Sequence, residues 1–292
     1  MTTIITHSGS FHPDDVFAVA ALRLAHKEQD VNVIRTRDES VIAVGEWVVD
    51  VGGVHDPVAQ RFDHHQPGAP VRENGIPYAA FGLVWQHIGT ELCGSPAVAE
   101  KLDEQLVQPI DAGDNGVNLY SLNDYGVKPF ELYQVVHSFT PPWGSGGSKD
   151  EAFMQAVEWA QGFLARYIEQ HRAYQAMDEL LHKTYDASSD KRILVFDVPI
   201  SAVAAVQYPD VQVVVCPDDP ETNSNWTATT VRKHMDTFES RVYFPETWAG
   251  LRTEDLAEAS GFPDAVFCHT ARFVFVAGSK SSTLQAAEQV VG

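Results

Sequence analysis

The sequence predicts an α/β protein: a mainly parallel-sheet N-terminal domain with helices on both faces, followed by a smaller α/β C-terminal domain. Short, apolar, β-branched segments alternate with helix-like stretches in the first half of the chain. A segment rich in Gly, Pro and Ser, "PPWGSGGSKD", interrupts this alternation near residue 143. We therefore expect a first domain over residues 1–142, a linker and long helical connection over 143–186, and a second domain over 187–292.

The elements of the first domain follow from their residue patterns. "TTIIT" at residues 2–6 is short, apolar and β-branched, which is typical of a buried strand. "DDVFAVAALRLAHKEQ" places apolar residues at steps of four, and Pro13 before it suits the first turn of a helix. Strands are also expected over 31–37 and 46–53, and helices over 78–93 and 95–113. Strands that alternate with helices indicate βαβ units and a parallel sheet.

The second half begins with a long helical stretch, expected over 151–186. Several short apolar segments and two helical pieces follow it. Strands are expected at 192–198, 211–218, 226–231, 241–245 and 265–277, and helices at 253–260 and 282–291. This mixture favours a second, smaller α/β domain.

Composition limits the classes of function. The 292-residue chain is 44% hydrophobic, enough for a large core, and carries a net charge of −20. A protein that grips long nucleic acid needs a basic face, so this chain would need a local device such as metal ions to bind phosphate. We expect a cytoplasmic protein for three reasons. The three cysteines are scattered, the sequence shows no signal-peptide pattern, and it has no apolar run long enough for a membrane span.

Histidines and aspartates gather at the expected ends of these elements. His7 ends the first strand, and Asp50 ends the third. The others are His12 and Asp14 in the turn after the first strand, Asp63, His64 and His65 in "RFDHHQ", and Asp111 and Asp114 in "PIDAGDNG". In an open parallel sheet, ligands bind outside the carboxyl ends of the strands, so these side chains could converge there.

The donor types indicate a metal site. Imidazole and carboxylate together suit Mn²⁺, Fe²⁺, Co²⁺ or Zn²⁺, and no thiolate accompanies them. Three histidines and three aspartates exceed what one tetrahedral ion needs. Two ions about 3.5–4 Å apart, bridged by a carboxylate and a hydroxide, would use them all.

Each residue also has a local explanation. His7 could be a hydrogen-bonded polar residue at a strand end, and Asp14 a favourable acid at a helix N-terminus. Asp50 could belong to the turn before two glycines, and Asp111 could cap or bridge local structure. The metal site is predicted because these signals coincide, in order, at successive element ends.

The strings "THSGSFHPDD", "VVDVGG", "FDHHQ" and "PIDAGDNG", in this order, resemble the motifs of the DHH phosphoesterase superfamily. That superfamily includes RecJ-type exonucleases, oligoribonucleases and family II inorganic pyrophosphatases. "PYAAFGLVW", "FESR", "WAGLR" and "SGFPDAVFCH" make the chain most similar to its melanocyte-proliferating-gene branch. The resemblance implies a catalytic domain with two divalent metal ions, most simply Mn²⁺, and a smaller domain that grips the substrate.

Carried over by position, the resemblance implies that His7, His12 and Asp50 hold one ion. The ligands of the other would be Asp14, Asp50, His64 and Asp111, so that Asp50 bridges the two ions. The superfamily usually has alternating aspartates where this chain has His12 and Asp14, and Asp15 is therefore an alternative to His12.

Further residues receive roles from the same resemblance. His65 would act at the substrate or its leaving group, and Asp63 would orient a neighbouring histidine. In the second domain, Arg241 and His269 would contact the substrate, because arginine binds phosphate with two hydrogen bonds.

The implied function is that of a metal-dependent phosphodiesterase, with 3′–5′ exonuclease-like hydrolysis of RNA or short oligonucleotides by activated water. The acidic composition fits short substrates better than long duplexes. Two alternatives stay open: hydrolysis of pyrophosphate or another small phosphoanhydride, and a metal-stabilised binding protein without catalysis. The sequence assigns neither the metal nor an oligomeric state.

Overall fold

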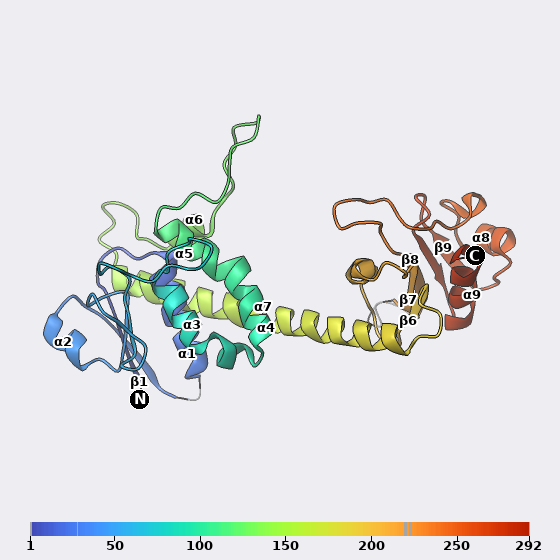
Figure 1. Ribbon diagram of the computed structural model, residues 1–292. Helices are drawn as coiled ribbons and strands as arrows, with labels where there is room; N and C mark the ends of the chain where they lie inside the picture. The colour runs from blue at the N-terminus through green and yellow to red at the C-terminus, as the bar shows by residue number, and fades with distance from the viewer. Residues whose placement is uncertain (1, 28, 219–220, 222–223, 292) are drawn as a thin grey trace. The chain divides into compact units, whose positions relative to one another are not determined.

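The computed structural model describes residues 2–27, 29–218, 221 and 224–291. The chain divides into two compact units, Met1–Ala173 (unit 1) and Tyr174–Gly292 (unit 2). Each unit contains a five-stranded sheet and helices, so the predicted α/β class is confirmed (Figure 1). The long helix expected after the glycine-rich segment is α7 (Lys149–Ala187), and its residues are shared between the two units.

The sheet of unit 1 has the strand order β2-β1-β3-β5-β4. Its strands are β1 (Thr2–Thr6), β2 (Val31–Arg35), β3 (Trp47–Val49), β4 (His55–Asp56) and β5 (Arg61–Phe62). β1 pairs in parallel with β2 and β3, β3 pairs in parallel with β5, and β4 runs antiparallel to β5. The sheet is therefore mainly parallel, as predicted, and the carboxyl ends of β1, β3 and β5 lie along one edge.

Helices cover both faces of this sheet, as predicted. They are α1 (Pro13–Ala25), α2 (Glu39–Val44), α3 (Ala80–Cys93), α4 (Pro96–Leu102), α5 (Gln108–Asp114) and α6 (Leu132–His137). Ile4 and Phe62 pack with α1 and α3 in the main core, whereas Ile5 and Val48 pack under the short helix α2. The split arises because successive strand residues point to opposite faces.

A single helical stretch runs from α4 through α5, with a π turn at Asp103–Val107 between them. Pro109 follows this turn at the start of α5. Proline lacks an N–H and crowds the preceding helical turn, and a widened π turn accommodates it.

The first part of α7 completes the core of unit 1. Phe153, Val157 and Leu164 are fully buried there, and Trp159 packs edge-on against Phe17 of α1 at 6.1 Å. Burial of apolar side chains of this size stabilises the fold by roughly 1.5–3 kcal/mol each. Helix α7 is therefore an integral part of the unit that carries the candidate site.

The sheet of unit 2 has the strand order β6-β7-β8-β10-β9. Its strands are β6 (Ile193–Val195), β7 (Val213–Pro217), β8 (Trp226–Thr230), β9 (Ala265–Cys268) and β10 (Val274–Ala277). Its helices are α8 (Thr253–Ser260) and α9 (Lys280–Val291), with 3₁₀ turns at Ala202–Gln207 and Glu246–Trp248. β6 and β7 are parallel, and the remaining pairs are antiparallel.

The strand predicted over residues 241–245 is wrong, because this segment is irregular. The Arg241 N–H donates to Val231 O, and the Phe244 N–H donates to Arg272 O, so the backbone pairs with two separate segments. Phe244 is buried in the core, which accounts for the apolar pattern that suggested a strand.

No helix within the described part of the chain combines the length and the apolarity needed to cross a membrane.

Candidate metal centre

The candidate site lies at the edge of the unit 1 sheet where β1, β3 and β5 end. His7 directly follows β1, Asp50 directly follows β3, and His64 comes two residues after β5. Pro13, at the start of α1, fixes the first turn that carries Asp14 and Asp15. The topology therefore brings together residues that are far apart in the sequence, as expected for the carboxyl edge of a parallel sheet.

Asp50 lies at the centre of the group. Its Oδ2 is 3.2 Å from His7 Nε2, and its Oδ1 is 3.4 Å from His64 Nε2. The two oxygens thus face different histidines, which is the arrangement that a bridging carboxylate needs. The backbone of Asp50 is left-handed, with φ of 56°. Aspartate tolerates this conformation better than most residues, and such strain is concentrated at functional sites.

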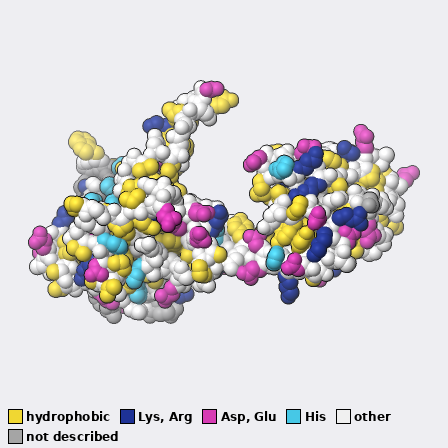
Figure 2. Space-filling view, viewed as in Figure 1, with side chains coloured by type: hydrophobic (Ala, Val, Ile, Leu, Met, Phe, Trp, Pro, Cys, Tyr) yellow, Lys and Arg dark blue, Asp and Glu magenta, His cyan; other side chains and the backbone are white. Residues whose placement is uncertain are grey.

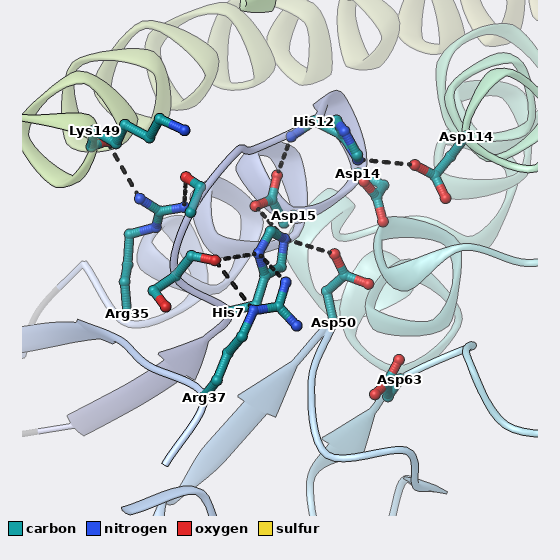
Figure 3. Close-up of polar contacts among 12 residues, drawn as sticks. His7, His12, Asp14, Asp15, Arg35, Arg37, Asp50, Asp63, Asp114 and Lys149 are labelled. Atoms are coloured by element: carbon teal, nitrogen blue, oxygen red, sulfur yellow. Dashed lines mark hydrogen bonds and ion pairs between the residues drawn. The ribbon is translucent and has the colours of Figure 1, made fainter. Parts of the chain in front are cut away.

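The first potential ligand group consists of His7, Asp15 and Asp50, and all three residues are buried. His7 Nε2 lies 3.1 Å from Asp15 Oδ2, and Figure 3 shows the imidazole between the two carboxylates. Burial favours a neutral imidazole, but hydrogen bonds and charges from Asp15 and Asp50 outweigh it and raise the pKa of His7 to about 10. A proton on His7 thus occupies the position that a cation could take.

The second potential ligand group consists of His12, Asp14 and Asp114. His12 Nδ1 lies 3.6 Å from Asp114 Oδ1. His64 joins this group, because its Nε2 lies 3.3 Å from Asp114 Oδ2 and 3.8 Å from Asp14 Oδ2. His64 therefore connects the second group to Asp50.

The Asp14 carboxylate is the least satisfied group in the site. The residue is fully buried, and neither carboxylate oxygen has a hydrogen-bond partner among the described residues. Burial, followed by repulsion from Asp50 and Asp114, raises the pKa of Asp14 well above its usual range. A buried carboxylate without a partner is costly, and a bound cation would remove that cost. The residues present therefore fit a divalent ion with oxygen and imidazole ligands.

The structure separates the two aspartates of "PIDAGDNG". The carboxylate of Asp111 is fully buried away from the cluster, where its Oδ2 pairs with Arg72 Nη1 at 2.7 Å. Its Oδ1 accepts the N–H of Gly82 at 3.0 Å. Asp114, not Asp111, therefore reaches the histidines.

His12 and Asp15 are also separated. Asp15 faces His7, whereas the His12 side chain faces Asp114. Asp15 additionally accepts the backbone N–H of His12 at 2.8 Å, which fixes the start of α1. Of His12 and its alternative Asp15, it is thus Asp15 that lies beside His7.

Asp63 lies behind the pair of adjacent histidines. Its Oδ1 is 2.7 Å from His65 Nδ1, and its Oδ2 accepts the Gly53 N–H at 2.6 Å. Asp63 is buried, while the His65 side chain is 62% exposed and 3.5 Å from Asp50 Oδ1. Asp63 therefore lies where a hydrogen bond to His65 Nδ1 would fix the orientation of that ring.

Arg37 also borders the site, although no sequence motif singles it out. Its Nη2 lies 3.3 Å from His7 Nδ1, and its Nε donates to Ser8 O at 3.3 Å, as Figure 3 shows for the guanidinium beside His7. Arg37 is exposed and forms no ion pair with a carboxylate in the described ranges. The available signal was its position just beyond β2, whose carboxyl end lies at the same sheet edge.

The two predicted substrate contacts of unit 2 differ in their surroundings. Arg241 donates from Nη1 to Tyr208 O and Val211 O, at 2.6 and 2.5 Å, and from Nη2 to Val206 O at 2.7 Å. These bonds hold the segment 206–211 in place. His269 lies in the turn between β9 and β10, where its Nδ1 accepts the Ala271 N–H at 3.0 Å.

Comparison with known proteins agrees with the motifs. The family described as uncharacterised protein family UPF0160, of the MYG1 exonuclease type, matches residues 3–291. The MYG1 exonuclease of Homo sapiens is 31% identical over 310 residues, covering 92% of this chain and 80% of that protein. The MYG1 protein of Caenorhabditis elegans is 28% identical over 316 residues, covering 94% and 91%.

A solved structure, the pGpG-specific phosphodiesterase PggH of Vibrio cholerae, aligns over 99% of this chain and 97% of that chain. Its sequence identity of 13% and TM-score of 0.34 are too low to support a conclusion about this protein. The family match over nearly the whole chain is sufficient: this protein belongs to the MYG1 exonuclease family, the melanocyte-proliferating-gene branch that its motifs predict.

Proposed function

We propose that this protein is a metal-dependent phosphodiesterase that hydrolyses short RNA or other short oligonucleotides, with 3′–5′ exonuclease-like action. The human relative bears the name exonuclease, and this chain shares its family over nearly the full length. The observation that supports the proposal most directly is the buried Asp14 carboxylate, which has no hydrogen-bond partner among the described residues and lies within a cluster of histidines and aspartates.

Two divalent ions, most simply Mn²⁺, would occupy the cluster. His7, Asp15 and Asp50 would hold one ion, and Asp14, His64 and Asp114 the other, with His12 beside the second. Asp50 would serve both ions, because its two oxygens face the two groups separately. Asp114 thereby replaces Asp111 in the ligand set expected from the sequence.

Divalent ions at such a site supply a hydrolytic water of lowered pKa and offset the charge of the phosphoryl oxygens. His65 is the residue placed to move a proton, because it is exposed, adjoins Asp50 and is oriented by Asp63. With Nδ1 directed at Asp63, its Nε2 is left to protonate the leaving oxygen of the substrate. Arg37 lies beside His7 Nδ1, and its guanidinium can donate to a phosphate through Nη1.

The net charge of the chain limits the classes of substrate that it can bind. At a net charge of −20, the protein is unsuited to binding the phosphate backbone of a long nucleic acid along its surface. A cluster that binds metal needs to grip only one or two phosphates, which favours a short single strand. His269 of unit 2 remains a proposed substrate contact, whereas Arg241 would have to release backbone carbonyls before it could bind a phosphate.

The test is hydrolysis of an end-labelled five-nucleotide RNA with added Mn²⁺, with and without a chelator. We expect mononucleotides released from the 3′ end, and no release after chelation. Turnover of pyrophosphate in preference to RNA would favour the small phosphoanhydride alternative. Stabilisation by metal without turnover of any ester would indicate a binding protein instead.

A further inference from the structure

A cavity of about 720 Å³ adjoins the candidate metal centre within unit 1. Its walls come from the start of α1, the stretch from the π turn to α5, the loop after α5, and α6. His12 and Asp114 belong both to this cavity and to the second ligand group. The cavity is therefore continuous with the site at which a phosphate would bind, and its volume is within the usual range for small-molecule pockets, about 300–1,000 Å³.

The cavity contains a half-exposed aromatic ring. The ring of Tyr133 stacks on His137 at 5.8 Å with an angle of 7° between the planes, and it lies 6.3 Å from the His12 ring. Tyr133 is 49% exposed and lines the cavity. His137 thus supports the tyrosine ring, which also borders the cavity and is half exposed there.

The opposite walls are largely apolar. Leu106 and Ile110 present a buried apolar floor from the helical stretch, and Leu119 comes from the loop at residues 116–131. This loop projects from unit 1 in Figure 1, and Figure 2 shows yellow apolar side chains along it. Val117 and Leu119 are exposed, although both line the cavity. Large apolar side chains that stay exposed beside a polar site are typical of a ligand-binding surface.

Polar groups are also available at the cavity wall. Asn118 provides a side-chain amide, and Lys128 and Glu131 provide one charge of each sign. Gln105 also lines the cavity, but its Oε1 already accepts from Tyr167 at 3.3 Å and lies 3.0 Å from His171 Nε2. Amides can both donate and accept hydrogen bonds, as the edges of nucleobases require. An aromatic ring, apolar walls and a few polar groups form the combination that binds unstacked bases in single-stranded nucleic acid.

We propose that this cavity binds the base of the nucleotide whose phosphate lies at the metal cluster, with the base stacked on Tyr133. The inference rests on the proposed phosphodiesterase function and adds a base-binding subsite to it. The second ligand group and the stacking ring border the same cavity. Residues of unit 1 alone could therefore bind both the phosphate and the base of one nucleotide.

The test compares a dinucleotide with two versions of it, each lacking the base at one of the two positions. We expect the wild type to show a KM about tenfold lower for the intact dinucleotide than for one of the base-lacking versions, because one stacked base contributes on this order. Tyr133→Ala should abolish the difference, whereas Tyr133→Phe should retain it, because phenylalanine keeps the ring. Tyr125→Ala is the matched control, since Tyr125 is 86% exposed on the loop that precedes α6 and does not line the cavity.

A second readout separates this inference from the proposed function. By calorimetry, the wild type should bind adenosine 5′-monophosphate about tenfold more tightly than ribose 5-phosphate in the presence of Mn²⁺, and Tyr133→Ala should lose this preference. That result would support the subsite even if no ester were hydrolysed. Equal binding of the two ligands by the wild type, or a Tyr133→Ala variant that keeps its preference for the base, would overturn the inference.

Discussion

Asp14 and Asp111 are both fully buried aspartates of unit 1, and burial raises the pKa of both, to about 7 for Asp111, yet their partners differ. Asp111 has a cation supplied by the chain, since Arg72 lies 2.7 Å from its carboxylate, and it also accepts a backbone N–H from Gly82. Asp14 has no hydrogen-bond partner within the described residues and is surrounded by other acids and by histidines. A buried carboxylate needs compensating partners, so the difference suits the binding of a divalent cation beside Asp14.

The residues around Asp111 pack closely against its carboxylate. A Cβ atom on Gly82 would lie 1.8 Å from Asp111 Oδ2, so only glycine allows helix α3 to approach so closely. Arg72 is held in turn by Asp103 at 3.0 Å and by the ring of Tyr78 at 3.9 Å. These contacts surround the Asp111 carboxylate with partners from the chain itself.

The largest effect is expected at the metal side of this comparison. Asp50→Asn should lower kcat/KM by at least about 10⁴-fold, because it removes the carboxylate that faces both ligand groups. Asparagine also tolerates the left-handed backbone at this position, so the fold should be retained. Steady-state hydrolysis of a short RNA, with Glu73→Gln as an exposed control, measures the effect; activity within tenfold of the wild type would contradict it.

The second largest effect is expected on stability, at the ion pair between Arg72 and Asp111. Arg72→Met should destabilise the protein by about 3–5 kcal/mol, because it leaves Asp111 buried and unpaired. The double variant Arg72→Met/Asp111→Leu should recover most of that loss, since an apolar pair needs no compensation. Denaturant unfolding of both variants in the presence of a chelator provides the measurement. A single variant as stable as the wild type would show that Asp111 is not held by Arg72.

A third prediction concerns pH and the metal-free protein. The pKa of His7 is raised to about 10, so the stability from its proton is complete below the ordinary value of 6.5 and is lost as the pH rises through 10. Metal ions compete with this proton, and their affinity should therefore increase with pH. We expect the Tm of chelated protein to fall between pH 6.5 and 10, and the stabilisation by Mn²⁺ to grow over the same range. Parallel Tm curves with and without metal would count against the site.

Asp50 determines how the stability of the metal-free protein changes at acid pH. Hydrogen bonds from His64 and His7 outweigh the effect of burial and hold the pKa of Asp50 at about 2. Its contribution to stability is therefore present above the ordinary carboxyl pKa of 3.8 and is lost as the pH falls towards 2. In chelator, His7→Gln should remove the fall in Tm between pH 6.5 and 10, and it should leave most of the fall in Tm at acid pH.

The smallest effect is expected in unit 2, where Arg241 resembles Arg72 in being used by the fold. Arg241→Ala should destabilise the protein by about 1–3 kcal/mol, because three backbone carbonyls lose their donor. The KM for a short RNA should change less than twofold. A rise in KM without any loss of stability would instead assign Arg241 to the substrate, as its motif suggested.

Much of the fold could be predicted, because strand and helix patterns in unit 1 are regular and the first strand, Thr2–Thr6, matches its expected bounds. The irregular segment 241–245 could not, because burial of Phe244 gives a strand-like pattern without a ladder. The convergence of His7, Asp50 and His64 followed from the parallel topology.

The sequence could not distinguish Asp111 from Asp114. They are three residues apart on α5, so both lie on nearly the same side of the helix. Which one reaches the histidines depends on Arg72, whose position is set by long-range packing. Arg37 was missed for a similar reason, because its contact with His7 depends on how the chain leaves β2.

The most direct test of the account is the metal content of purified protein, measured by elemental analysis after incubation with Mn²⁺ and removal of free ions. The wild type and Glu73→Gln should retain about two equivalents of metal, and Asp14→Asn about one or none. Asp14→Asn should also be at least as stable as the wild type in chelator, because it removes a buried ionisable carboxyl that has no hydrogen-bond partner among the described residues. A wild type that retains no metal, or an Asp14→Asn variant that retains as much as the wild type, would contradict the central claim.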